Sequence, residues 1–178
     1  MSRITTILII IFLQLYLFST KSLAEDYIPE PYSWTSMSEN SSGSMPCGGH
    51  DIGLNIWAES GSIYFYACQS GWFDENNMLL KAGRFRIDFS NPLQNSGFQQ
   101  TLDLYNGYVT IKDAKHEVRL WVDTFSPIIY IELLQTNGDD INFSYETWRH
   151  KARLVTKDEC QQNSWKWDIP KNCTTFAD

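Results

Sequence analysis

The stretch SIYFYACQSGWFDENNMLLKAGRFRIDF, Ser62–Phe89, holds two segments that alternate as β-strands do, with a polar and aromatic loop between them. In Arg84–Phe89 three apolar residues alternate with three charged ones, which is typical of a strand with one buried face. In Ser62–Gln69 both alternate sets are mostly apolar or aromatic, which indicates burial on both sides. The loop between them offers at most a turn or two of helix, because Gly83 ends the apolar run.

The same alternation recurs along the chain, with Gly, Asn or Pro turns between the segments. Asn106-Gly107 is a strong hairpin turn signal between two of them. Ile128–Leu134 is almost continuously apolar, so we expect it to be buried on both faces. We predict an all-β fold, an antiparallel β-sandwich, with these strands: Asp51–Trp57, Ser62–Gln69, Arg84–Phe89, Thr101–Leu104, Tyr108–Lys112, Val118–Val122, Ile128–Leu134 and Ile141–Tyr145.

The two ends of the chain differ from this middle. Residues 1–24 read as a secretory signal peptide, since the 15-residue apolar run Ile4–Phe18 is too short to span a bilayer. Ser22-Leu23-Ala24 then provides the small residues of a cleavage site after Ala24. The mature chain would be secreted and would have no membrane segment. Residues 25–44 form a polar lead-in, residues 45–149 the sandwich domain, and residues 150–178 a tail that the strand pattern does not explain.

The charge of the chain excludes some partners. Removing residues 1–24 takes away two of the 14 basic residues, which leaves 12 against 21 acidic residues and a net charge of −9. Nucleic acids and anionic membranes both require clustered Lys and Arg, so we expect neither as a partner. No glycine-rich phosphate loop is present, and we expect no cofactor.

The cysteines and sequons suit an oxidising compartment. Four cysteines allow three disulfide connectivities. We favour Cys160–Cys173, which would close a short loop, and keep both a Cys47–Cys68 pair and two buried thiols open for the remainder. The three candidate N-glycosylation sites are Asn40, Asn142 and Asn172.

The loop after Gly71 is the best candidate site. Flat rings stack on the apolar faces of sugars, and carboxylates and amides pair with sugar hydroxyls. The carbohydrate-contact candidates are Trp72, Phe73, Asp74, Glu75 and Asn76. The alternative is that the acidic and amide side chains bond to their own backbone while the rings cap the core.

Other chemistries fit the sequence less well. A glycosidase needs two carboxyl groups flanking one bond, and neighbouring residues such as Asp74 and Glu75 are poorly placed for that, so no catalytic residue is assigned. The segment Cys47-Gly48-Gly49-His50-Asp51 has metal-ligand types, but a structural zinc usually needs four ligands in recognisable clusters. We therefore expect no metal and explain the glycines by a tight turn.

Five segments taken in order resemble a known family: MPCGGHDIGLNIW (Met45–Trp57), the loop and strand Gly71–Phe89, NGYVTI (Asn106–Ile111), LWVDTFSPIIYIEL (Leu120–Leu133) and YETWR (Tyr145–Arg149). The stretch Ser44–Arg149 resembles the N-terminal β-sandwich family called domain of unknown function 5703. Members of that family precede glycoside-hydrolase-like (α/α)6 barrels, and the layout is similar to the first domain of family 95 α-L-fucosidases. The resemblance implies that this chain is part of a larger sandwich with an incomplete sheet and unpaired edges.

The resemblance also implies a function. The Trp72–Asn77 loop would reach the carbohydrate pocket of a barrel that this chain lacks, and the sandwich would brace that barrel without being catalytic itself. In YETWR we expect Trp148 to pack against the sheet and Arg149 to pair with a carboxylate such as Glu146. The alternatives from other classes are a free-standing carbohydrate-binding module and a non-catalytic extracellular interaction domain.

Overall fold

The computed structural model describes residues 28–156 and 172–177 and confirms the all-β prediction. Apart from one 3-10 turn, η1 (Ser41–Gly43), every regular element in the described residues is a strand. The strands are β1 (Tyr32–Trp34), β2 (Met45–Gly49), β3 (Ile52–Glu59), β4 (Ser62–Gln69), β5 (Gly83–Phe89), β6 (Gln99–Asp103), β7 (Tyr108–Lys112), β8 (Glu117–Val122), β9 (Ile129–Gln135), β10 (Ile141–Glu146), β11 (Arg153–Leu154) and β12 (Thr174–Thr175). None of the described residues form a helix long and apolar enough to cross a membrane.

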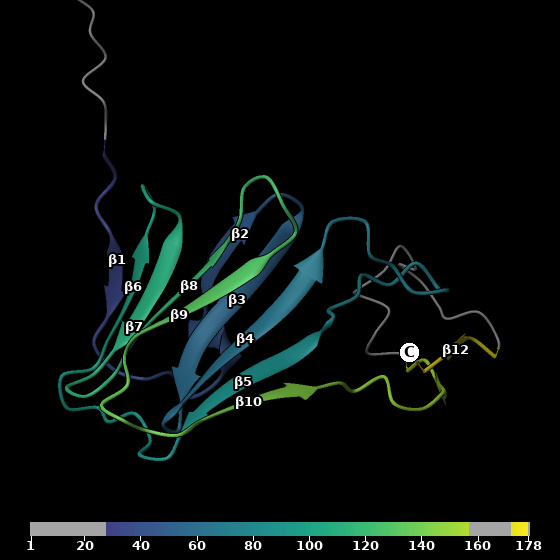
Figure 1. Ribbon diagram of the computed structural model, residues 1–178. Helices are drawn as coiled ribbons and strands as arrows, with labels where there is room; N and C mark the ends of the chain where they lie inside the picture. Colours follow the sequence, from purple (N-terminus) through teal and green to yellow (C-terminus); the bar gives the residue numbers. More distant parts are fainter. Residues whose placement is uncertain (1–27, 157–171, 178) are drawn as a thin grey trace, which may run out of the picture.

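Two five-stranded antiparallel sheets pack face to face as a sandwich (Figure 1). Sheet A has the order β1-β6-β7-β8-β9, and sheet B has the order β10-β5-β4-β3-β2. The expected polar lead-in supplies β1, which pairs with β6 at the edge of sheet A. The tail supplies β11 and β12, which form a separate two-stranded ribbon.

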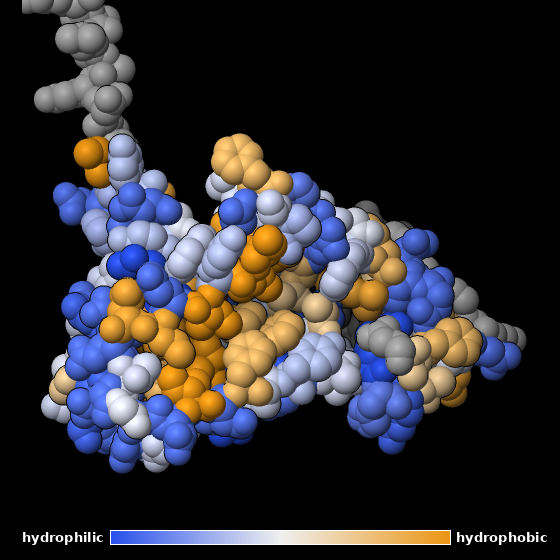
Figure 2. Space-filling view, viewed as in Figure 1, coloured by the Kyte–Doolittle hydropathy of each residue, from blue (hydrophilic) through white to orange (hydrophobic). Residues whose placement is uncertain are grey.

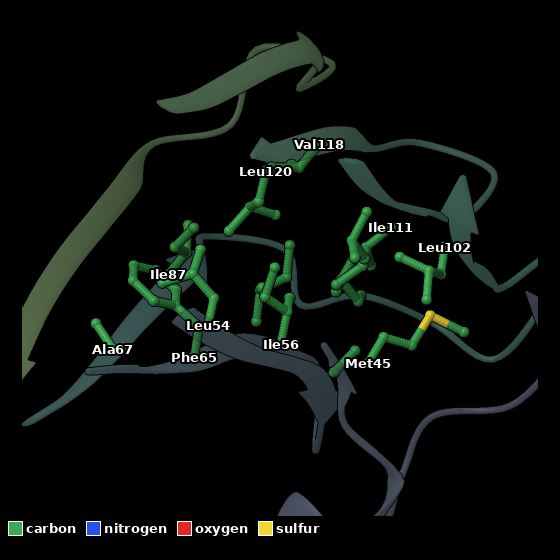
Figure 3. Close-up of a cluster of buried hydrophobic side chains, with 14 of the residues drawn as sticks. Met45, Leu54, Ile56, Phe65, Ala67, Ile87, Leu102, Ile111, Val118 and Leu120 are labelled. Carbon is green, nitrogen blue, oxygen red and sulfur yellow. The ribbon is translucent and has the colours of Figure 1, made fainter. Parts of the chain in front are cut away.

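The core lies between the sheets and follows from the alternation in the sequence. In β8 every second residue points inward, and Val118 and Leu120 are fully buried against Ile56 and Ile87 of sheet B's inner face (Figure 3). Full burial of one such side chain contributes about 1.5–3 kcal/mol. The alternating apolar residues therefore fix the register of the strands, since a shift of one residue would turn a strand's apolar side chains from the core to the solvent.

The sandwich is open along one side, where β9 ends sheet A and β10 ends sheet B. The short β9–β10 connection crosses from sheet A to sheet B on this side. Inward-facing apolar residues of both strands are partly exposed to solvent. Leu133 lies opposite Val118 and is 44% exposed, and Phe143 lies opposite Ile87 and is 52% exposed. We give the name apolar seam to four of the inward residues of these two strands: Ile131, Leu133, Phe143 and Tyr145. Figure 2 shows apolar side chains gathered on this side of the molecule.

The seam corrects one expectation. Ile128–Leu134 was expected to be buried on both faces, but β9 is an edge strand and five of its seven residues are exposed. An edge strand has a free row of backbone N–H and C=O groups and no neighbour to cover its side chains. The expected unpaired edges are present at β9 and β10.

A buried polar cluster ties the loops at one end of the sandwich. The side chain of His116, in the β7–β8 turn, is fully buried, with Nδ1 3.0 Å from Asp113 Oδ1 and Nε2 2.7 Å from Asp139 Oδ2. Asn91 donates a hydrogen bond to the other oxygen of Asp139. Both ring nitrogens of His116 therefore face a carboxylate oxygen. The cluster joins the β5–β6, β7–β8 and β9–β10 connections.

Candidate functional site

The candidate loop lies between β4 and β5, at the end of the sandwich opposite the His116 cluster (Figure 1). Its fold is local. Asp74 is buried, and its Oδ1 accepts hydrogen bonds of 2.8 Å from the backbone N–H groups of both Asn76 and Met78. Asn77 has a φ of 58°, a left-handed conformation that Asn tolerates better than most residues. The Asx-type bonding that was the alternative interpretation of Asp74 is therefore present.

The polar side chains of this loop hold the C-terminal strand β12. Asn76 Nδ2 donates to the carbonyl of Thr174 at 2.8 Å, and the thiol of Cys173 donates to Asn76 Oδ1 at 3.0 Å. Glu75 Oε1 accepts from the backbone N–H of Phe176 at 2.5 Å. The predicted sugar-contact residues Asp74, Glu75 and Asn76 thus come together, with their polar groups bonded within the chain.

Arg149 completes this junction. Its Nη1 donates to Thr175 Oγ1 at 2.8 Å and lies 3.8 Å from Asp74 Oδ2, and its Nη2 lies 3.6 Å from Glu75 Oε2. Arg149 was expected to pair with a carboxylate such as Glu146, and the carboxylates that it faces are those of Asp74 and Glu75. Glu146 accepts from Nε and Nη2 of Arg84 at 2.7 and 2.5 Å, because the β10–β5 register sets Glu146 opposite Arg84.

The junction also sets the protonation of its titratable groups. Burial acts to raise the pKa of Glu75, but hydrogen bonds from backbone N–H groups, including Phe176, and the Arg149 guanidinium outweigh it, so the pKa lies below its ordinary value. Burial raises the pKa of the Cys173 thiol, and the carboxylates of Asp74 and Glu75 add to that effect. Glu75 is therefore held as a carboxylate and Cys173 as a thiol at neutral pH.

The two aromatic residues of the loop remain at the surface. Trp72 is 42% exposed and Phe73 is 55% exposed. They line a hollow of about 440 Å³ whose walls are Gly71, Trp72, Phe73, Leu80, Lys81, Ala82 and Tyr145. Tyr145 is fixed there because its hydroxyl donates to the carbonyl of Ala82 at 2.5 Å. The rings that were expected to face a sugar are accessible.

A second hollow of about 240 Å³ adjoins the first and shares Leu80 and Lys81 with it. Its wall combines aliphatic, aromatic and charged groups: Asp74, Met78, Leu79, Leu80, Lys81, Trp148, Arg149, Arg153 and Thr175. Lys81 Nζ sits 4.1 Å from the centroid of the Tyr66 ring, and Trp148 packs edge-on against the same ring. Trp148 therefore packs against sheet B, as expected.

Sequence reasoning missed Lys81, Tyr145 and Arg153 as lining residues. Lys81 had one usable signal, since it follows the aromatic loop directly. The other two residues lie more than 60 positions further along the chain, and only the sheet register and the ribbon β11–β12 bring them near the loop.

The remaining candidates lie apart from this site. Asn40, Asn142 and Asn172 are all exposed. Cys47, Cys68 and Cys173 are free thiols, and Cys160 lies outside the described residues. Cys47 and Cys68 are not brought together: Cys47 faces the core opposite Leu54, whereas Cys68 lies opposite Gly53 on the outer face of sheet B.

The turn between β2 and β3 consists of His50 and Asp51, whereas Cys47, Gly48 and Gly49 lie in β2. The glycines were expected to form the turn, but Gly49 instead permits a close approach, since a Cβ there would collide with the carbonyls of Val122 and Asp123. His50 has a φ of 49°, and its Nδ1 lies 2.7 Å from Asp51 Oδ1. Asp51 also accepts a hydrogen bond from Gln69, which together with His50 lowers its pKa. In the part of the chain that the structure describes, no three His, Cys, Asp or Glu side chains are grouped as metal ligands.

Comparison with known proteins places the chain in a family. The family model described as domain of unknown function (DUF5703), in its N-terminal form, matches residues 33–178. No curated protein and no solved structure matches the chain. The match spans most of the sequence and includes all of β2 to β12 and two of the three residues of β1. The chain therefore belongs to the DUF5703 N-terminal domain family.

Proposed function

We propose that this chain is a secreted, non-catalytic β-sandwich that accompanies a glycoside-hydrolase-like barrel and lends its Trp72–Asn77 loop to a carbohydrate pocket. The association with a barrel, and the likeness to the first domain of family 95 α-L-fucosidases, rest on the resemblance of the motifs quoted above. The carbohydrate role rests on the geometry of the loop.

The observation that carries the proposal is the pair of exposed rings at the rim of a hollow. Trp72, Phe73 and Tyr145 all line the same hollow, and apolar and aromatic walls with a few polar groups are typical of ligand sites. The loop is also held firmly, since its polar groups bond to its own backbone and to β12. A rigid loop loses little conformational freedom when a sugar stacks on it.

The protonation of the loop argues against independent hydrolysis there. A glycosidase needs one carboxyl group with a raised pKa to act as an acid, about 5–10 Å from a second carboxylate. Asp74 is buried and accepts two backbone hydrogen bonds, and the pKa of Glu75 is lowered. Neither side chain is placed to protonate a leaving group.

The apolar seam supports the bracing role. Edge strands β9 and β10 present free backbone groups beside half-exposed apolar side chains. Such edges invite further protein to pair with them or pack on them. A sandwich that stands against another part of a larger protein would cover this side.

Affinity gel electrophoresis of the full chain through gels with embedded polysaccharides tests the carbohydrate role. We expect one class of glycan to retard the chain, and Trp72→Ala to abolish the retardation. Trp34→Ala is the matched control. Trp34 is 41% exposed, much like Trp72, but it lies on β1, the edge strand of sheet A away from β9, and not in the loop between β4 and β5 of sheet B. No retardation by any glycan, or equal loss in both variants, would overturn the carbohydrate role.

A free-standing carbohydrate-binding module is the second candidate, and the same exposed rings favour it. The two candidates predict different exposure of the apolar seam in solution. A module that works alone should run as a monomer with no hydrophobic dye bound at the seam, whereas a bracing domain should bind dye until its partner covers β9 and β10. An extracellular interaction domain without a sugar ligand would show seam-dependent association and no glycan retardation.

A further inference from the structure

We propose that the outer face of sheet A carries a second saccharide site, separate from the Trp72–Asn77 loop, in a hollow formed by β6, β7 and β8. The outer face is the side of sheet A turned away from sheet B (Figure 1). The ligand is an uncharged saccharide, recognised through its hydroxyl groups and the apolar face of its ring. This site goes beyond the proposed function, because the residues that line it differ from those of the loop and of the two hollows beside the loop.

The outer-face hollow follows from the same alternation that builds the core. In β7 Val109 and Ile111 are fully buried, so Tyr108, Thr110 and Lys112 face outward. Strands β6 and β8 alternate in the same way, and outward residues of the three strands line a hollow of about 310 Å³. That volume lies at the small end of the range for ligand sites, roughly 300–1,000 Å³.

The wall of this hollow presents hydrogen-bond donors and acceptors side by side. Lys112 and Arg119 donate, the carboxylate of Glu117 accepts, and the hydroxyl of Thr110 does both. Lys112 lies directly opposite Glu117 across β7 and β8, and Thr110 lies directly opposite Arg119. A sugar hydroxyl both donates and accepts, so it finds a partner at each of these positions. A charged substituent would lie close to a group of its own sign, and for this reason we assign an uncharged saccharide.

The polar side chains of the wall keep hydrogen-bonding capacity for a ligand. In the part of the chain that the structure describes, Lys112 and Glu117 form no ion pair, although the register sets them opposite each other. The Arg119 guanidinium lies over the Tyr108 ring, 4.4 Å from its centroid, and Nη1 donates to Glu132 at 3.4 Å. Within the described residues the buried Nε of Arg119 has no hydrogen-bond partner. Arg119 is therefore held in place while its five N–H groups are only partly used.

A row of three aromatic rings crosses sheet A beside the hollow. Tyr108 lines the hollow, Trp121 lies directly opposite it on β8, and Tyr130 lies directly opposite Trp121 on β9. The rings of Trp121 and Tyr130 stack with their centroids 5.0 Å apart, and Tyr130 is 39% exposed. Neighbouring strands lie about 4.8 Å apart, so the row extends about 10 Å from the hollow to the edge of the sheet. A chain of several sugar units can place one unit in the hollow and another against these rings.

The frame of the site is rigid. On the side of β1, Ser33 Oγ lies 2.9 Å from Thr101 Oγ1, and Gln99 Nε2 donates to Ser33 Oγ at 3.3 Å. The remaining side chains project from three neighbouring strands whose spacing the sheet fixes. A polar outer face is ordinary for a sandwich, but a hollow of ligand size next to a row of rings on rigid strands is typical of a binding site.

Affinity gel electrophoresis of the full chain tests the site with four neutral polysaccharides, each in its own gel: hydroxyethyl cellulose, arabinoxylan, galactomannan and glycogen. The walls of the loop site and of the outer-face hollow differ, so we expect the two sites to bind different polysaccharides. One of the four gels should retard the Trp72→Ala variant as strongly as the parent chain. In that gel, adding Trp121→Ala to Trp72→Ala should weaken the affinity at least about tenfold, because the stacking surface beside the hollow is lost.

A second pair of variants separates lost contacts from lost folding. Lys112→Ala removes an exposed side chain of the hollow and should weaken the affinity about threefold or more. Lys115→Ala is the matched control, because Lys115 is equally exposed but lies in the β7–β8 turn, outside the hollow. Both variants lose one positive charge, so they should move alike in a gel without polysaccharide. Both should also melt like the parent chain, which keeps the comparison valid even if Trp121→Ala unfolds.

The other outcomes distinguish the two sites. Retardation of the parent chain that disappears completely in Trp72→Ala would refute the outer-face site and leave the loop's role standing. Retardation that Trp121→Ala and Lys112→Ala remove, with no polysaccharide affected by Trp72→Ala, would support the outer-face site and refute the loop's role. Retardation that all three substitutions leave unchanged would place the saccharide elsewhere and refute both sites. No retardation in any of the four gels would refute the outer-face site.

Discussion

Leu133→Ala and Leu120→Ala form a matched pair that measures how far the apolar seam is open. Both leucines point inward from sheet A, and they lie on neighbouring strands, β9 and β8. Leu120 is fully buried, whereas Leu133 is 44% exposed. We expect the substitution on β8 to destabilise the chain far more than the same substitution on β9.

The magnitudes follow from the burial. Truncating a fully buried leucine to alanine costs about 2–5 kcal/mol, which includes the cavity that remains. Leu133 keeps a little over half of its surface in contact with the protein, so its truncation should cost about 1–3 kcal/mol. The two variants should therefore differ by about 1–2 kcal/mol in the free energy of unfolding.

Urea denaturation of the parent chain and both variants, followed by tryptophan fluorescence, gives these values. With a slope of about 1–3 kcal/mol per molar urea, the two midpoints should differ by roughly 0.3–2 M. A hydrophobic dye should also bind the parent chain more strongly than it binds Leu133→Ser. Equal destabilisation by the two alanine variants, at every protein concentration, would show that the seam is closed in solution and would refute this reasoning.

Two further predictions concern the polar clusters. Asp113 and Asp139 both have lowered pKa values. For Asp139 the leading causes are the hydrogen bonds from His116 and Asn91. For Asp113 burial acts to raise the pKa, but the hydrogen bonds that its carboxylate accepts from backbone and side-chain groups outweigh burial. The two ionised carboxylates should stabilise the fold fully above the unfolded-state pKa of about 3.9, and this stabilisation should be lost as the pH falls through their lower folded-state pKa values. The urea midpoint should therefore fall less steeply with decreasing pH in Asp113→Asn than in the parent chain. Asp74→Ala should lower the free energy of unfolding by about 3 kcal/mol, because two backbone N–H groups lose a charged acceptor, and equal melting of this variant and the parent would contradict the assigned Asx-type bonds.

The strands could be predicted because one-sided burial leaves a period of two in the sequence. Phe85, Ile87 and Phe89 alternate with charged residues, and the structure turns these three inward with the charged side chains outside. The burial of β9 could not be predicted in this way. An apolar run is equally compatible with a central strand and with an edge, and the difference lies in what pairs with its far side.

The loop was predictable only in its local part. Asp74 bonds to residues two and four positions ahead, which is ordinary turn chemistry for Asp. The bonds of Glu75 and Asn76 with Phe176 and Thr174, in and just after β12, connect residues about 100 positions apart. No short-range pattern in the sequence predicts such contacts. The same limit hid His116, whose partner Asp139 belongs to another connection.

Tyr145 joins the two open features of the molecule. Its ring packs on Phe85 on the inner side of sheet B, within the seam, while its hydroxyl is bonded to Ala82 and its edge lines the larger hollow. Gly83 accommodates this approach, since a Cβ at that position would collide with the Tyr145 ring. Any segment that packs over the seam at this point would hold one wall of the hollow in place. We therefore expect that covering the seam would strengthen saccharide binding at the proposed loop site through this one side chain, and that Tyr145→Phe, which keeps the ring and removes the bond to Ala82, would weaken that effect in affinity gel electrophoresis.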